Sequence, residues 1–232
     1  MNRLQRAGGF AALYEAAAYV IGIIGFLFVV NTSGVTDPIA QVAFVAANQT
    51  ALAVLHLLVY VVWGAMMIVL ALALKERLQA ATPALAQVAA VFGLLWGGII
   101  IASGMIYNSG MDTAVALYAQ NPEQAATVWL AVESVYTGLG GGNEIVGGIW
   151  VLLLSVAALR SGALPRLLNY LGLLISAAGL LSVIPALNEI AVMVFGLGQI
   201  VWFVWLGIVM LRQPVPAREA PVLIPNPGMG TD

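Results

Sequence analysis

Three ionisable side chains and one amide inside apolar segments are the best candidates for chemistry in this sequence. Glu144 follows Asn143 in GGNEIVGG, Glu15 follows Tyr14 in the first apolar segment, and His56 is the single histidine of the chain. An ionisable group within a membrane segment is costly to place there and marks a functional site by default. We therefore predict that these four residues bind a ligand or take part in proton transfer.

Glu144 and His56 are expected at similar depths in a membrane. Glu144 precedes Arg160 by 16 residues and His56 precedes Lys75 by 19 residues. In helices these separations are about 24 Å and 28 Å, against a hydrocarbon layer of about 30 Å. A contact between Glu144 and His56 could sense pH or relay a proton, because histidine titrates near neutrality. The alternative is structural: Glu144 is protonated or bonded to a neighbouring helix, and His56 is an interfacial side chain bonded to water.

Two further carboxylates are placed elsewhere. Glu15 belongs to the opposite, cytoplasmic half of the bundle, next to Tyr14 and one helical turn before Tyr19. Either an interhelix hydrogen bond or a role in proton movement would explain a carboxylate at Glu15. Glu133 lies about 40 Å above Arg160 along a helix, so we expect it outside the membrane and solvated.

Several kinds of chemistry are excluded by the residues that the chain lacks. The sequence has no cysteine and one histidine, which rules out disulfides, thiolate metal sites and bis-histidine haem ligation. No nucleophile motif surrounds Ser103, and the glycines from Gly138 onward do not complete a dinucleotide-binding fingerprint. A net charge of −2 without a basic run gives no footprint for nucleic acid. We therefore expect no cofactor, no metal and no nucleic-acid partner, and we favour a function without catalysis.

Composition determines the class of protein. Hydrophobic residues make up 62% of the chain and charged residues 8%, whereas about a quarter of the residues of a soluble protein are charged. The predicted fold is an all-α polytopic membrane bundle over residues 1–212, followed by a disordered cytoplasmic tail at 213–232 that holds five prolines.

The first apolar segment is predicted to be a transmembrane helix and not a cleaved signal peptide, because it is longer than the apolar core of such a peptide. The six predicted transmembrane helices are residues 8–30, 53–74, 84–106, 140–160, 167–184 and 190–211.

Basic residues predict the orientation. All eight fall at the termini and at the two turns that six crossings place on one side: Arg3, Arg6, Lys75, Arg77, Arg160, Arg166, Arg212 and Arg218. Because basic residues stay on the cytoplasmic side, both termini are predicted to be cytoplasmic.

The two long loops on the other side each begin a helix. Asp37-Pro38 and Asn121-Pro122 pair a capping side chain with a proline that needs no amide donor. Helices 2 and 4 should therefore overshoot the membrane, and we expect their extensions, 38–52 and 122–139, to pack as an extracytoplasmic helical cap, together with residues 111–120. In the alternative, the Gly138–Gly142 run breaks helix 4, and its outer part lies along the interface. The matched spacing also suggests a repeated hairpin.

Three stretches carry a resemblance to a known family. They are RAGGFAALYEAAAYVIGIIG, GGGNEIVGGIWVLLLSVAALRSGALPRLLNYLGLLISAAGLL and VFGLGQIVWFVWLGIVMLR. They resemble a family of uncharacterised six-helix bacterial membrane proteins described as a domain of unknown function. The resemblance implies a bacterial inner-membrane protein with six helices and transfers no catalytic residue.

Three functions remain open at this point. The first is a binding or sensory module that takes an apolar or amphipathic, lipid-like small molecule into an outward-facing cavity near Glu144 and His56. The second is a small proton-coupled transporter that uses the same polar cluster. The third is an accessory subunit, either as a homo-oligomer or within a larger membrane complex. In all three the lipid bilayer is the immediate partner.

Overall fold

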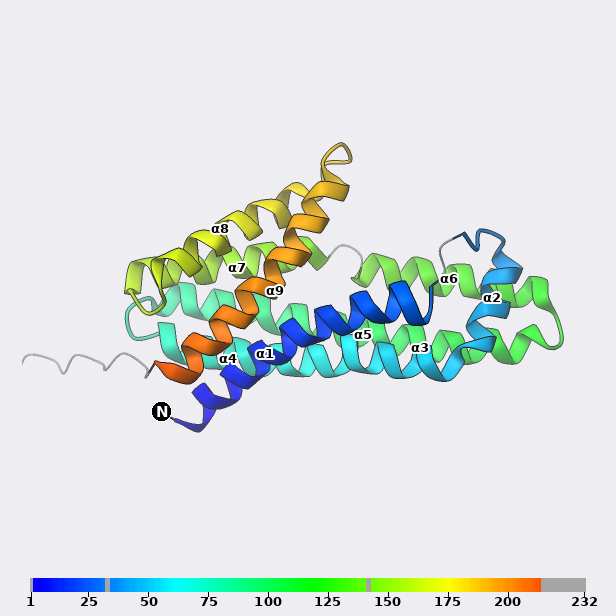
Figure 1. Ribbon diagram of the computed structural model, residues 1–232, viewed down its shortest axis with the longest axis horizontal. Helices are drawn as coiled ribbons and strands as arrows, with labels where there is room; N and C mark the ends of the chain where they lie inside the picture. Colours follow the sequence, from blue (N-terminus) through cyan, green and yellow to red (C-terminus); the bar gives the residue numbers. More distant parts are fainter. Residues whose placement is uncertain (1, 32–33, 141–142, 214–232) are drawn as a thin grey trace, which may run out of the picture.

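Helices form every regular element in the part of the chain that the structure describes. This computed structural model describes residues 2–31, 34–140 and 143–213. Figure 1 shows the elements in sequence colours. Their order is α1 (Arg3–Ile24), η1 (Gly25–Val29), α2 (Pro38–Ala47), α3 (Gln49–His56), η2 (Leu57–Val62), α4 (Trp63–Leu78), α5 (Pro83–Tyr118), α6 (Pro122–Gly140), α7 (Asn143–Ser161), α8 (Arg166–Leu181) and α9 (Asn188–Arg212), with η1 and η2 as π-helical segments.

Five helical stretches are long and apolar enough to cross a membrane, by length and composition. They are Arg3–Val29, Gln49–Leu78, Pro83–Tyr118, Pro122–Ser161 and Asn188–Arg212. Two apolar helices, α2 and α8, are shorter. The 16 residues of α8 rise about 24 Å in a helix, less than the ~30 Å of a hydrocarbon layer. The predicted all-α membrane bundle is therefore confirmed at the level of its class, while the predicted tail lies outside the described residues from 214 onward.

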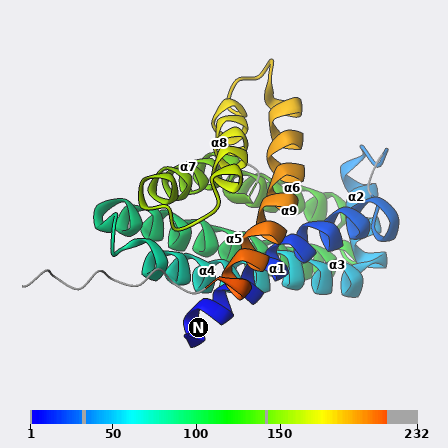
Figure 2. The ribbon, with the colours of Figure 1, turned by 60° about the vertical axis from the view of Figure 1, so that its left-hand side comes forward.

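Six of the described helices pack in a closed ring. Each contacts the next in the order α1, α4, α5, α7, α8, α9 and back to α1. The first and last long helices are therefore neighbours. Figure 2 shows the hairpin of α8 and α9 projecting from the body formed by α4, α5 and α6. Outside the ring, α6 and α2 pack on α5 and on each other.

The two Asx-Pro pairs begin helices, as predicted. The Asp37 carboxylate accepts a hydrogen bond from the Ala40 amide at 2.8 Å, and Asn121 Oδ1 accepts one from the Gln124 amide at 3.1 Å. These side chains satisfy amides that the first helical turn would otherwise leave unpaired.

The helical extensions differ from the prediction in two places. The second predicted transmembrane helix with its extension, residues 38–74, is interrupted at Asn48. The Asn48 φ of −117° and ψ of 16° separate α2 from α3. Because of that break α2 leaves the axis of α3 and packs on α6 and α5. The third predicted transmembrane helix, residues 84–106, is longer than expected, since α5 continues without interruption to Tyr118. Whether helix 4 passes unbroken through Gly138–Gly142 depends on residues 141–142, which lie outside the described residues.

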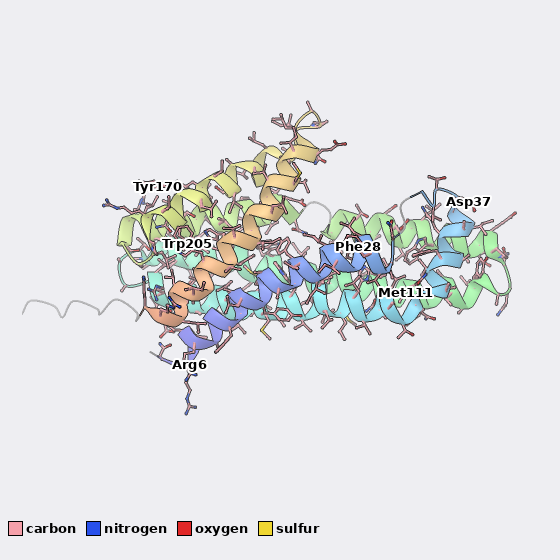
Figure 3. The ribbon with its side chains drawn as sticks, in the orientation of Figure 1. Arg6, Phe28, Asp37, Met111, Tyr170 and Trp205 are labelled. Atoms are coloured by element: carbon pink, nitrogen blue, oxygen red, sulfur yellow. The ribbon has the colours of Figure 1, made fainter. Side chains whose placement is uncertain are left out.

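Four chain segments that carry basic residues meet at one end of the molecule. The start of α1, the α4–α5 turn, the α7–α8 turn and the end of α9 lie together on the left of Figure 1. Arg6 lies at this end and Asp37 at the opposite one in Figure 3. Arg77, only 3% exposed, joins the segments. It donates hydrogen bonds to the Ala163 carbonyl at 3.1 Å, the Gln213 carbonyl at 3.2 Å and Gln5 Oε1 at 3.4 Å.

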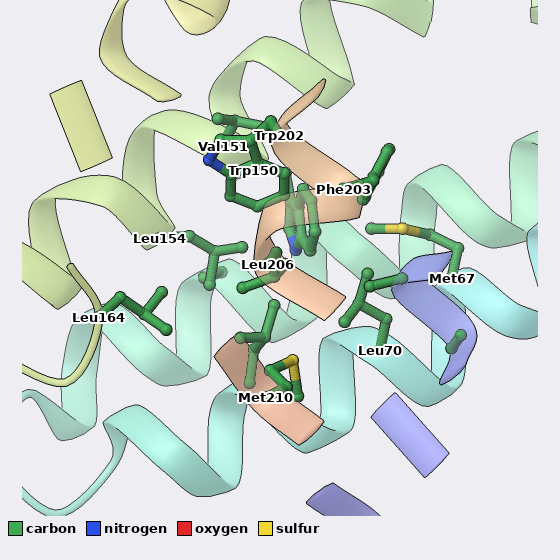
Figure 4. Packing of buried hydrophobic residues seen from close by; sticks show 14 of the residues in the cluster. Met67, Leu70, Trp150, Val151, Leu154, Leu164, Trp202, Phe203, Leu206 and Met210 are labelled. Atoms are coloured by element: carbon green, nitrogen blue, oxygen red, sulfur yellow. The ribbon is translucent and has the colours of Figure 1, made fainter. Parts of the chain in front are cut away.

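The core consists of two hydrophobic clusters. The larger fills the helix ring, where Trp150, Trp202 and Phe203 pack edge to face with aliphatic side chains around them (Figure 4). The smaller joins α2, α3, α5 and α6 around Met111 and Trp129. Within this cluster α2 and α6 pack against each other and against the part of α5 that begins at Met111.

Glycines allow the closest helix contacts. A Cβ atom on Gly64 would lie 2.5 Å from the Gly97 carbonyl oxygen, and one on Gly97 would lie 2.7 Å from the Gly64 carbonyl oxygen. The backbones of α4 and α5 therefore touch, as expected for small residues in membrane helices.

Candidate functional site

Three neighbouring cavities in the structure share lining residues. We call them the bundle cavity, the Glu144 cavity and the His56 cavity. Tyr19, Tyr60 and Asn143 line both of the first two. Tyr136 lines both of the last two. The shared walls make this series of cavities the main candidate site.

The bundle cavity is the apolar member. It has a volume of about 240 Å³. Its walls come from α1, η1, η2, α4 and α5, and the Asn143 amide stands at its boundary with the next cavity. Its lining residues are Ala18, Tyr19, Gly22, Ile23, Phe26, Val59, Tyr60, Trp63, Trp96, Ile100 and Asn143.

The Glu144 cavity is more polar and holds about 360 Å³. Glu144 sits at the start of α7 and is half-buried in its wall. The polar neighbours are three tyrosines, Thr137 and Asn143, while α9 adds an apolar side. Its lining residues are Tyr19, Tyr60, Tyr136, Thr137, Gly140, Asn143, Glu144, Val192, Phe195 and Gly196.

Hydrogen bonds fix the polar groups between these cavities. Asn143 Oδ1 accepts a bond from Trp96 Nε1 at 3.3 Å, and Asn143 Nδ2 donates one to the Gly140 carbonyl. The hydroxyls of Tyr60 and Tyr136 bond to each other. These bonds fix the orientation of the side chains in the cavity walls.

His56 belongs to the third cavity and is 1% exposed. Its Nδ1 donates to the Leu52 carbonyl at 2.9 Å. Its ring stacks on Tyr107 with centroids 3.5 Å apart and 9° between the planes. His56 and Glu144 therefore lie in different cavities, with Tyr136 in the wall of both. The structure brings Asn143 and Glu144 together and places His56 in the adjoining cavity.

Glu15 lies outside the three cavities, fully buried in α1. Within the described chain neither of its carboxylate oxygens has a hydrogen-bond partner, so the predicted interhelix hydrogen bond is not formed by those residues. Tyr19, one turn later on α1, lines both the bundle cavity and the Glu144 cavity.

Sequence reasoning missed two kinds of site residue. Tyrosines supply most of the hydroxyl groups of the cavities, and their positions within apolar segments were the available signal. Glu133 was expected in solvent, but it is half-buried and lines the His56 cavity. Among the described residues, no three His, Cys, Asp or Glu side chains gather in a way that could hold a metal ion.

The closed ring of apolar helices and its tyrosine-rich cavities define an integral membrane protein of the helical-bundle class. Comparison with protein families makes this assignment more specific. The family described as a domain of unknown function (DUF4386) matches residues 11–209, and the chain belongs to this family. The resemblance predicted from the sequence is thereby confirmed. Searches of curated proteins and of solved structures found no match.

Proposed function

We propose that this protein binds an amphipathic small molecule in the joined bundle and Glu144 cavities, without catalysing a reaction. The observation that carries the proposal is the polarity of the joined space: aromatic walls at one end, and a carboxylate with tyrosine hydroxyls at the other. Such a space fits a molecule with an apolar chain and a polar head.

Size and lining support this function. The two cavities, about 240 Å³ and 360 Å³, together reach the range of about 300–1,000 Å³ that is common for small-molecule sites. Phe26, Trp63 and Trp96 offer a large apolar surface to the chain of a ligand. Burial of that chain supplies the driving force, at about 25 cal/mol per Å² of apolar surface.

The polar end selects the head group. Glu144 presents an acceptor, and the Asn143 amide is already engaged at both its oxygen and its nitrogen. A head group that donates hydrogen bonds, such as a hydroxyl or an amine, therefore complements this end better than a carboxylate does. A bound carboxylate would face Glu144 with like charge.

The proposal includes an orientation in the membrane. If the end that carries the basic residues is cytoplasmic, the Glu144 cavity opens away from the cytoplasm of a bacterial inner membrane. In this arrangement α8 counts as the sixth crossing, and α2 with the outer parts of α5 and α6 forms the extracytoplasmic cap. An amphipathic molecule could then enter from the outer leaflet.

Short-range fluorescence quenching tests the binding site. The full chain in lipid nanodiscs is titrated with bromododecanol, whose bromine quenches tryptophan on contact. We expect saturable quenching, because Trp63 and Trp96 line the bundle cavity. Glu144→Gln should weaken the apparent affinity about tenfold, the loss expected for a charge-assisted hydrogen bond.

A matched pair of glycine variants supplies the control. Gly196 lines the Glu144 cavity and Gly98 is on the exposed face of α5, and a Cβ atom at either position meets nothing within 4 Å. Gly196→Leu should fill the cavity and abolish saturable quenching, whereas Gly98→Leu should not change it. Equal, non-saturable quenching in both variants and in the natural chain would refute the proposal. Protein-dependent flux of the probe across the membrane of proteoliposomes would show that the protein transports the molecule and does not only bind it.

A further inference from the structure

The His56 cavity has features that the proposed function does not use. It holds about 200 Å³. Its walls come from η1, α2, α3, α5 and α6, so it belongs to the smaller hydrophobic cluster. Its lining residues are Phe26, Val30, Val35, Gln41, Val45, Leu52, His56, Tyr107, Trp129, Glu133 and Tyr136.

Two buried polar atoms in its lining have no partner within the described chain. They are His56 Nε2 and Gln41 Oε1. In both side chains the other polar atom is held by a backbone carbonyl: His56 Nδ1 bonds to Leu52, and Gln41 Nε2 donates to Val35 at 3.1 Å. A carbonyl can only accept, so the nitrogen facing it must be the donor.

These fixed bonds determine what the unpaired atoms can do. With Nδ1 protonated, Nε2 of the neutral imidazole is an acceptor, and Gln41 Oε1 is an acceptor in any state. A buried acceptor without a donor costs about 1–3 kcal/mol. The cavity therefore calls for a ligand that donates at least two hydrogen bonds.

Charge and aromatic rings define the ligand further. Glu133 lines the cavity, one helical turn after Trp129. Tyr107 and Tyr136 line the same cavity as this carboxylate. Besides the His56 imidazole, four aromatic rings line the same space: Phe26, Tyr107, Trp129 and Tyr136. Faces of aromatic rings attract cations, and an anionic carboxylate does so more strongly.

From these observations we propose that the His56 cavity is a second binding site, specific for a small primary ammonium ion. The ammonium group donates three hydrogen bonds, which matches the acceptors His56 Nε2, Gln41 Oε1 and the Glu133 carboxylate. The aromatic rings enclose its short alkyl part. None of these three acceptors lines the bundle cavity or the Glu144 cavity.

Binding is measured by isothermal titration calorimetry on the full chain in nanodiscs, with butylammonium chloride as the probe. Butanol and tetramethylammonium chloride serve as comparison ligands of similar size. We expect saturable binding of butylammonium and binding at least about tenfold weaker for the other two. Butanol lacks the charge, and tetramethylammonium has no N–H donor.

Variants test whether the named acceptors form the site. His56→Phe keeps an aromatic ring for the Tyr107 stack and removes the acceptor, while Gln41→Leu removes the other. Each should weaken butylammonium binding about tenfold. Gln124→Leu, on the exposed part of α6, is the matched control and should have no effect. Glu144→Gln should also leave butylammonium binding unchanged, which separates this test from that of the proposed function.

Four results would overturn the inference. They are absence of saturable binding, equal binding of butanol, unchanged affinity in both His56→Phe and Gln41→Leu, and displacement of butylammonium by Zn²⁺ at stoichiometric amounts. The last would make the same residues a metal site. Because circular dichroism reports folding of each variant, loss of binding in a variant that keeps the helical spectrum of the natural chain supports the proposal.

Discussion

Arg77 donates hydrogen bonds to three parts of the chain that are distant in sequence. Its guanidinium reaches α1, the α7–α8 turn and the residue after α9. Its removal leaves several buried acceptors without a donor, and hydrogen bonds to charged groups contribute about 1.5–3 kcal/mol each. We predict that Arg77→Met lowers the free energy of unfolding by about 2–4 kcal/mol, measured by SDS titration in mixed micelles.

Arg6→Met is the control for this prediction. Arg6 carries the same charge at the same end of the molecule but is exposed. Its substitution should change the free energy of unfolding by less than about 0.5 kcal/mol. Equal effects of both substitutions would show that charge, and not the buried hydrogen bonds of Arg77, stabilises this end.

Glu15 provides a second prediction for a single residue. A fully buried carboxyl with no partner among the described residues destabilises the fold, because its desolvation is not compensated. Methionine has similar length and no such cost. Glu15→Met should therefore raise the free energy of unfolding by about 1–3 kcal/mol, measured by the same titration.

Glu123, whose carboxylate is exposed, is the control position for Glu15. Glu123→Met should leave the stability of the protein nearly unchanged. If Glu15→Met instead destabilises the protein, a bound proton donor or cation satisfies the carboxyl in the natural chain. A functional role of Glu15 would follow from that result.

Candidate site residues could be identified from the sequence where a polar side chain stands inside an apolar segment. Glu144 and Asn143 were identified because polar groups in apolar segments are costly, and both line a cavity. The separation of His56 from Glu144 was not predictable, because equal depth along two helices does not determine which way a side chain points. Arg77 was expected at a cytoplasmic turn, and its burial depends on acceptors from distant segments.

At the scale of whole helices, the contact between α4 and α5 depends on two glycines. Gly97 has no space for a side chain, since its Cβ would lie 2.7 Å from the Gly64 carbonyl oxygen. We predict that Gly97→Ala lowers the free energy of unfolding by about 1–3 kcal/mol through overpacking. Thermal or SDS denaturation measures the change.

The neighbouring Gly98 offers a close control on the same helix. A Cβ atom there meets nothing within 4 Å, and alanine is the better helix former. Gly98→Ala should be neutral or slightly stabilising. A loss of stability at Gly98 as large as that at Gly97 would contradict the assigned packing.

Helix starts were more predictable than helix breaks. Asp37 and Asn121 cap helices as expected because capping is a local interaction between a side chain and amides two or three residues later. The break at Asn48 has a weaker local signal, and packing of α2 on α6 stabilises it. The length of α5 exceeded the prediction because the part of α5 that ends at Tyr118 packs against α6, which membrane thickness alone does not reveal.

For the whole molecule, the orientation can be tested with single cysteines. The chain has no natural cysteine, so each introduced thiol is unique. Ala80 and Gln120 are exposed, in the turns before and after α5. In intact cells a membrane-impermeant maleimide should label Gln120→Cys and not Ala80→Cys, since basic residues mark the cytoplasmic side. Labelling of Ala80→Cys alone would show that the protein has the opposite orientation in the membrane.

The contact between α1 and α9 has a consequence for synthesis. Gly9 and Gly207 approach so closely that a Cβ on Gly207 would lie 2.9 Å from the Gly9 carbonyl oxygen. The ribosome delivers α1 before α9, and residues are added at about 5–20 per second. The face of α1 that α9 covers must therefore wait roughly ten seconds or more in the lipid before its partner emerges. During that interval an insertase or a nearby helix of another protein can occupy this face.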